Sequence, residues 1–93
     1  MNILITNVRP YTKNTLKSFV SVLLSDVGLE IRDCTYHEGP GKRWINLPAK
    51  PYTTTDGKLA YSYIIDFPDK INHLKFQQQA LAALDEYLTR NST

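Results

Sequence analysis

The sequence predicts an α+β domain, a curled antiparallel β-meander of about five strands followed by a long C-terminal helix. Two observations support this class. Apolar and polar residues alternate in short runs, separated by turn-forming residues, over the first part of the chain, and apolar residues then recur at helical spacing. With 93 residues the chain has the size of one domain, which we expect to span residues 1–93.

The clearest strand is residues 15–24, where apolar side chains fall on both faces. One face carries Val20 and Val22, and the other carries Phe19 and Leu23. Apolar groups on both faces predict either a central strand or a strand whose outer face is covered by something else, such as a second copy of the chain.

The other strands are shorter or irregular. Proline donates no hydrogen bond to a ladder, so Pro10 is expected to end the first strand. The alternation within residues 29–38 changes phase, which a β-bulge near Arg32 and Asp33 would explain. We expect these strands at residues 2–8, 29–38, 43–47 and 58–67, with a polar loop at residues 51–57.

A helix is expected from Lys70 to about Thr89, with Asp69 as its N-cap. Its apolar residues form two adjacent stripes, of which one is enough to cover a small sheet. The second stripe and the outer strand face therefore predict a homodimer. The first stripe holds Ile71, Leu74, Leu81, Leu84 and Leu88, the second holds Phe76, Ala80, Ala83 and Tyr87, and the predicted interface is Phe19, Leu23, Phe76 and Tyr87.

Composition limits the class of protein. Hydrophobic residues make up 42% of the chain and charged residues 22%, values typical of a folded globular protein rather than a disordered one. No apolar run is long enough for a membrane span, and the first residues do not read as a signal peptide. The single cysteine, Cys34, suits a reducing compartment. We expect a cytoplasmic protein without a membrane partner.

Residues with catalytic or metal-binding chemistry are few. Cys34, His37 and His73 are the only soft metal ligands, and the first two stand three residues apart on a strand, which points them to opposite faces unless the bulge intervenes. Cys34 is expected on the core side of its strand, without the strained turn that presents a nucleophile. The sequence predicts no catalytic residue, no metal site and no cofactor, and hence no enzyme.

A basic segment in the middle of the chain predicts nucleic-acid binding, although the net charge is only +2. Cations and aromatic residues interleave there, an arrangement that suits phosphates and stacked bases. Two alternatives stay open: the segment is an ordinary solvated loop, or Trp44 serves core or dimer packing. The predicted binding residues are Lys42, Arg43, Lys50, Tyr52, Lys58, Lys70 and Lys75.

The order of several short segments resembles the SpoVG family, the stage V sporulation protein G or septation regulators. The segments are Ile5-Thr6-Asn7-Val8-Arg9, Ile31-Arg32-Asp33, Trp44-Ile45-Asn46-Leu47-Pro48-Ala49-Lys50, Asp56-Gly57 and Lys70-Ile71-Asn72, and the resemblance spans residues 5–88. It implies a homodimer that binds DNA or RNA and acts as a regulator rather than an enzyme. By position, Lys50 and Lys70 correspond to two lysines of the family pattern.

The chain also departs from that pattern. Pro68-Asp69 stands where the family has a basic residue, and Asn91-Ser92-Thr93 replaces a basic tail. These departures suggest a divergent member, such as a phage or mobile-element copy. A curled sheet followed by a helix also resembles the positive-cofactor-four type of single-strand binder, although a shared architecture does not establish a shared function.

The resulting hypothesis is a non-catalytic, dimeric nucleic-acid-binding regulatory protein. The sequence leaves open whether the nucleic acid is DNA or RNA and whether it is single-stranded or duplex. The alternative is a protein–protein interaction module that does not bind nucleic acid.

Overall fold

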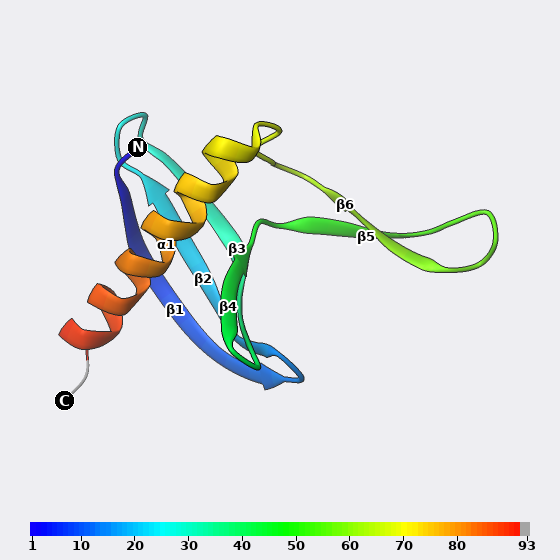
Figure 1. Cartoon of the computed structure of the whole chain (residues 1–93), viewed down its shortest axis with the longest axis horizontal. Helices are drawn as coiled ribbons and strands as arrows, with labels where there is room; N and C mark the ends of the chain where they lie inside the picture. Colours follow the sequence, from blue (N-terminus) through cyan, green and yellow to red (C-terminus); the bar gives the residue numbers. More distant parts are fainter. Residues whose placement is uncertain (92–93) are drawn as a thin grey trace.

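Consecutive strands pair into a four-stranded antiparallel sheet, one face of which is covered by a single helix (Figure 1). The computed structural model describes residues 1–91, and it confirms the α+β class, with the meander preceding the helix. The sheet is formed by β1 (Ile3–Lys13), β2 (Leu16–Leu24), β3 (Leu29–Gly39) and β4 (Lys42–Asn46), a separate hairpin by β5 (Ala49–Thr53) and β6 (Leu59–Tyr63), and the helix is α1 (Lys70–Arg90).

The strand order β1-β2-β3-β4 places β2 inside the sheet, which is one of the two alternatives that its two apolar faces predicted. Val20 and Val22 lie on the side that meets the helix and are almost completely buried. Phe19 and Leu23 alternate with them, lie on the opposite face and are half-buried. One strand therefore supplies both the core and the face that the helix leaves uncovered.

The predicted β-bulge in β3 is confirmed. Val20 pairs with Cys34 and Val22 pairs with Ile31, so two residues of β3 lie opposite one residue of β2. Asp33, the second of these two residues, has a φ of 60°. The extra residue restores the phase of the strand, and both Ile31 and Cys34 reach the core.

Helix α1 begins as predicted, with the Ile71 backbone N–H donating to Asp69 Oδ1 at 2.8 Å. Phe76, Ala80 and Leu84 of α1 are completely buried against the sheet. The prediction that Phe76 belongs to a dimer interface is therefore wrong, because its ring fills the core of the single chain.

The apolar stripe on the outer side of α1 faces away from the sheet. Ile71 is 63% exposed, Leu74 60% and Leu88 46%, whereas Tyr87 packs partly against the core. The periodicity predicted two stripes without indicating which one covers the sheet. The side that covers the sheet combines Phe76, Ala80 and Leu84, so it takes residues from both predicted stripes.

Edge strand β4 receives its outer hydrogen bonds from a helix side chain. The Ile45 N–H donates to Gln77 Oε1 at 3.0 Å, and Gln77 Nε2 donates to the Ile45 carbonyl at 2.5 Å. Because β4 has β3 as its only neighbour strand, these backbone groups have no ladder partner. Gln77 satisfies them and covers the edge.

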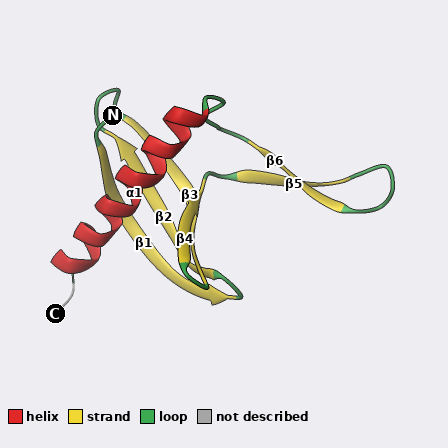
Figure 2. Cartoon of the chain, viewed as in Figure 1, coloured by secondary structure: helices red, strands yellow, loops and turns green. Residues whose placement is uncertain are grey.

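The β5–β6 hairpin extends away from the sheet as an arm (Figures 1 and 2). The predicted polar loop at residues 51–57 is wrong in its first part, since Ala49–Thr53 forms β5. The last strand ends at Tyr63 rather than at residue 67, and it pairs with β5 in a second sheet. The meander therefore has six strands in two sheets instead of about five in one.

The first strand also runs further than predicted. Pro10 lies inside β1, opposite Ser18, and the strand continues to Lys13. Because β1 is an edge strand, one row of its backbone groups has no ladder partner, and proline is tolerated there. Within residues 1–91, no helix is both long and apolar enough to cross a membrane.

Candidate nucleic-acid interface

The cations predicted to bind nucleic acid lie on three parts of the molecule. Lys42 and Arg43 begin β4, Lys50 and Tyr52 lie on β5, Lys58 precedes β6, and Lys70 and Lys75 lie in the first turns of α1. Figure 1 shows that the β3–β4 turn, the tip of the hairpin and the start of α1 point to different sides. The structure therefore does not gather all seven residues into one surface.

Arg43 is held by a carboxylate of the helix. Its two terminal nitrogens donate to the two carboxylate oxygens of Asp85, both at 2.7 Å. These hydrogen bonds lower the pKa of Asp85 and raise the pKa of Arg43. A guanidinium that is engaged in this way ties β4 to α1, so we remove Arg43 from the proposed phosphate contacts.

The lysines are free by comparison. Among residues 1–91, the side chains that form ion pairs with carboxylates are Arg32, Arg43 and Arg90, and no lysine does so. Arg9 also lacks a carboxylate partner within the same residues. These exposed cations keep their charge available for an external anion.

The face of the sheet opposite α1 carries a continuous set of polar and aromatic side chains. Phe19 of β2 lies between Arg9 of β1 and Thr35 of β3, and Thr35 in turn pairs with Asn46 of β4. We call this row the open face, together with the next pair of β3 and β4, His37 and Trp44, and with Tyr11 and Lys42.

Aromatic rings on the open face stack on one another. The His37 and Trp44 rings lie parallel, with centroids 5.2 Å apart and planes inclined by 2°. Tyr11 packs against Phe19, with a centroid distance of 5.6 Å. Trp44 is half-buried on this face and does not belong to the core of the single chain, whereas its predicted alternative role in dimer packing stays a prediction.

Two free cations lie over these rings. The guanidinium of Arg9 is 4.9 Å from the centroid of the Phe19 ring, and the ammonium of Lys42 is 5.2 Å from that of Trp44. Each cation is held near a ring by the ring's quadrupole and keeps its other side open to solvent. The open face thus presents both of the groups that a nucleic acid requires.

Both ring nitrogens of His37 have hydrogen-bond partners. The Thr15 and Thr35 hydroxyls lie 2.9 and 3.0 Å from Nδ1 and Nε2, respectively. Partial burial lowers the pKa of His37. One threonine hydroxyl can donate to the ring nitrogen without a hydrogen, and the other can accept from the ring N–H. A neutral imidazole is therefore satisfied at both of its nitrogens.

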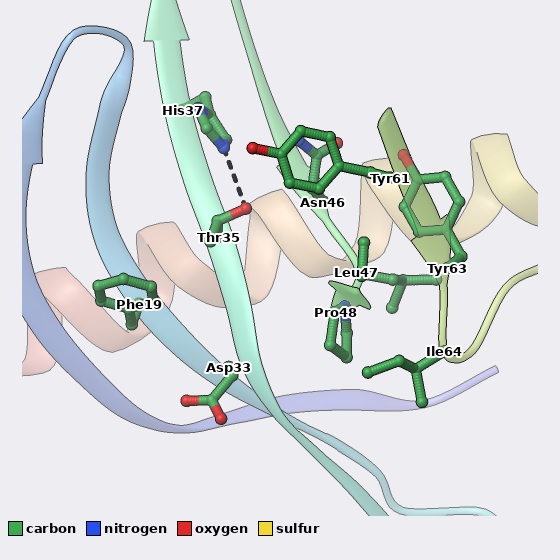
Figure 3. Close-up of a pocket in the computed structure, with 11 residues that line it drawn as sticks. Phe19, Asp33, Thr35, His37, Asn46, Leu47, Pro48, Tyr61, Tyr63 and Ile64 are labelled. Atoms are coloured by element: carbon green, nitrogen blue, oxygen red, sulfur yellow. Dashed lines mark hydrogen bonds between the residues drawn. The ribbon is translucent and has the colours of Figure 1, made fainter. Parts of the chain in front are cut away.

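A groove of about 720 Å³ separates the open face from the base of the hairpin (Figure 3). Tyr61 and Tyr63 of β6 line it from the hairpin side, and Tyr61 extends toward Asn46, Thr35 and His37. The lining residues are Phe19, Asp33, Thr35, His37, Asn46, Leu47, Pro48, Ala49, Tyr61, Tyr63 and Ile64.

The hairpin is amphipathic, and its two sides follow from its register. Pro51 pairs with Tyr61, whereas Lys50 and Tyr52 pair with Ser62 and Ala60 on the other side. The groove therefore receives the tyrosines of β6. Lys50 and Tyr52, predicted as a phosphate contact and a stacking ring, lie on the side of the hairpin that faces away from these tyrosines.

Sequence reasoning missed most of the open face. The sequence leaves the role of Trp44 open and predicts Phe19 in a dimer interface. It does not indicate Arg9, His37 or Tyr61 as contacts. The signal was present in the alternation of β3 and β4, where aromatic and polar residues occupy every second position. The alternation within each strand does not reveal the register between strands, which brings residues 9, 19, 35 and 46 into one row.

Cys34 lies on the opposite side of the same strand and is completely buried, as predicted. Burial, together with the nearby charge of Asp33, raises the pKa of the Cys34 thiol to about 12. Cys34 and His37 thus point to opposite faces of β3. Within residues 1–91, no three His, Cys, Asp or Glu side chains come together as a metal site.

Comparisons of the chain with protein-family models, curated proteins and solved structures found no match. The geometry of the open face and the chemistry of its residues therefore carry the proposed function.

Proposed function

We propose that this protein is a non-catalytic, dimeric nucleic-acid-binding regulator that acts in the cytoplasm. The observation that carries the proposal is a sheet face not covered by the helix, on which two unpaired cations, Arg9 and Lys42, lie over aromatic rings. Cations neutralise phosphates, and rings on the same surface accept bases by stacking. The resemblance of the segment order to the SpoVG family supports the same class of function.

The proposed phosphate contacts differ from those predicted. Arg9 and Lys42 flank the rings of the open face, while Lys50 and Lys58 on the hairpin extend the positive charge along an arm. Lys70 and Lys75 belong to α1, which covers the other face of the sheet. We therefore leave these two helix lysines out of the interface and use Lys75 as a control.

The dimer is supported by the exposed stripe of α1. Ile71, Leu74 and Leu88 are exposed, Leu81 is half-buried, and these four recur after three or seven residues, which is the spacing of a seam between two helices. A two-fold axis would place the same stripe of both chains in one contact and bury the leucines that a single chain leaves exposed. This contact leaves the open face available to nucleic acid.

Nucleic-acid binding is tested by fluorescence anisotropy with labelled single-stranded DNA, duplex DNA and RNA. If three to five phosphates are neutralised, the log–log slope of affinity against salt is about −2 to −4. The double substitution Arg9→Glu with Lys42→Glu should abolish binding. The control, Lys75→Glu with Arg90→Glu, changes the net charge equally on α1 and should retain most of the affinity.

Dimerisation is tested by light scattering of the purified protein. Leu74→Glu introduces a charge into the proposed seam at an exposed site, so the domain should fold and become monomeric. Lys75→Glu, one residue further along the helix and outside the seam, should stay dimeric. A wild-type protein that is monomeric at tens of micromolar, a range that covers most stable dimers, would remove the dimer from the proposal.

The second candidate is a protein–protein interaction module, favoured by the exposed apolar side chains of the hairpin. Leu59 and Tyr61 of the hairpin and Ile64 directly after it are more than half exposed. An isolated pair of strands is only marginally stable in water, so a bound partner would stabilise this arm. This module would be indifferent to every oligonucleotide. The same anisotropy series therefore distinguishes the two functions.

A further inference from the structure

The groove between the open face and the hairpin has the size and composition of a ligand site. Its volume of about 720 Å³ is within the range of pockets that hold small organic groups. Rings from both walls line it, with Phe19 and His37 on the sheet and Tyr61 and Tyr63 on the hairpin. From these features, and on the basis of the proposed nucleic-acid-binding function, we infer that the groove binds unpaired bases of a single-stranded nucleic acid.

The aromatic lining favours a single strand over a duplex. Duplex bases are stacked on each other, and their faces are not available to a protein ring unless the duplex opens. A single strand can turn its bases out and insert them between rings, whatever the base, because every base has a π-face. Phe19 lines the groove from the sheet and Tyr61 lines it from the hairpin, so rings are available to bases from both sides (Figure 3).

A polar group inside the groove matches the edge of a base. Among residues 1–91, no protein group forms a hydrogen bond with the half-buried Asn46 side chain, and this side chain lines the groove. Its amide offers two donor hydrogens and an acceptor oxygen in one plane, which complement the donor and acceptor pattern of a base. Thr35, beside it, already shares its hydroxyl with His37. Asn46 is thus the group available for base recognition.

The charges around the groove define where the backbone of the strand lies. Arg9 lies over the lining residue Phe19, and Lys42 lies over Trp44, which stacks on the lining residue His37. Asp33 is the one carboxylate among the lining residues, and it lies in the β3 bulge, away from the β3–β4 turn that carries Lys42. Phosphates are attracted to the two cations and repelled by Asp33, while the bases occupy the apolar interior.

The first test compares two tyrosines of the same hairpin. Tyr61→Ala removes a ring from the groove, and Tyr52→Ala removes a ring from the other side of the arm; both side chains are about half exposed or more. Loss of one base–ring stack should weaken binding of a 12-nucleotide single strand about tenfold in Tyr61→Ala, within the range of such contacts. Tyr52→Ala should bind as the wild type does.

The second test uses an abasic strand with the same number of phosphates. It should bind the wild type at least as weakly as the normal strand binds Tyr61→Ala, because it also lacks the base contacts of Phe19 and Asn46, and Tyr61→Ala should weaken its binding no further. The single tryptophan, Trp44, gives an independent signal, since a base that enters beside His37 should quench its fluorescence whereas the abasic strand should not.

The outcomes separate the inference from the function on which it depends. Equal affinity for the abasic and normal strands, or duplex bound as tightly as the single strand, overturns the base-binding groove and leaves a phosphate-binding protein. Equal losses in Tyr61→Ala and Tyr52→Ala also overturn it. A protein that binds no oligonucleotide overturns the proposed function, and the groove inference with it.

Discussion

The two faces of the four-stranded sheet come from the same residues in alternation, yet they differ in chemistry. The face under α1 carries Val20, Ile31 and Ile45, whose side chains are at most 5% exposed. The open face carries Phe19 and Trp44, which are no less apolar but are only half-buried and lie under cations. Hydrophobicity alone therefore does not distinguish a core face from a recognition face. The two faces differ in whether α1 covers them and in whether cations lie beside their apolar side chains.

The first and largest expected difference concerns stability. Phe76→Ala removes a ring that is completely buried between α1 and the sheet, so the free energy of unfolding should fall by about 3–5 kcal/mol. Phe19→Ala removes the same ring from the open face and should cost less than half as much. Urea unfolding followed by circular dichroism measures both, and equal losses would show that the open face is a second core.

The second prediction concerns the glutamine that covers the β4 edge. Gln77→Leu leaves the Ile45 N–H and carbonyl without their side-chain partners in a partly buried place, which should destabilise the fold by about 1–3 kcal/mol. Gln78→Leu changes an exposed neighbour and should have little effect. Hydrogen exchange at the Ile45 amide provides a local readout, because only Gln77→Leu should accelerate it.

Those features that depend on local pattern could be predicted from the sequence. The bulge at Arg32 and Asp33 follows from a change of phase within a single strand, and the Asp69 cap follows from its place before an apolar period. The central position of β2 follows from its two apolar faces. Each of these inferences uses residues that are close in sequence.

Features that depend on tertiary contacts could not be predicted. Gln77 is a polar residue in a run of three glutamines, and only its position beside β4 reveals its role. Arg43 reads as a phosphate ligand until Asp85, far along the chain, is found next to it. Pro51 and the polar residues after it predict a loop where β5 lies. The strand is recognisable only from its pairing with β6, which forms an amphipathic hairpin.

The third prediction separates a structural cation from a binding cation. Arg43 and Asp85 form a partly exposed pair, so Arg43→Ala should lower stability by at most about 1 kcal/mol. It should also weaken nucleic-acid binding much less than Lys42→Ala, although the two residues are adjacent and carry the same charge. Anisotropy titrations at one salt concentration compare them directly. If Arg43→Ala loses more binding affinity than Lys42→Ala, Arg43 rather than Lys42 is the phosphate contact at the start of β4.

The last and smallest effect is a pH dependence of stability that originates on the open face. Partial burial holds the pKa of His37 below its usual 6.5, so the unfolded chain binds more protons at this residue than the folded one. Stability should be highest above about pH 7 and fall as the pH drops through 6.5 toward the lowered pKa of the folded state. Below that value both states are protonated and the loss is complete.

The pH effect belongs to one histidine, so substitution identifies it. His37→Gln keeps a polar side chain near Thr15 and Thr35 but cannot titrate, and it should flatten the dependence between pH 7.5 and 5.5. His73→Gln, on the exposed surface of α1, should retain the wild-type slope. The carboxylates whose pKa the fold lowers, Glu30 and Asp85, lose their contributions only in more acidic solution, outside this window. If the pH dependence of stability persists in His37→Gln, it does not come from His37, and burial on the open face does not lower the pKa of this ring.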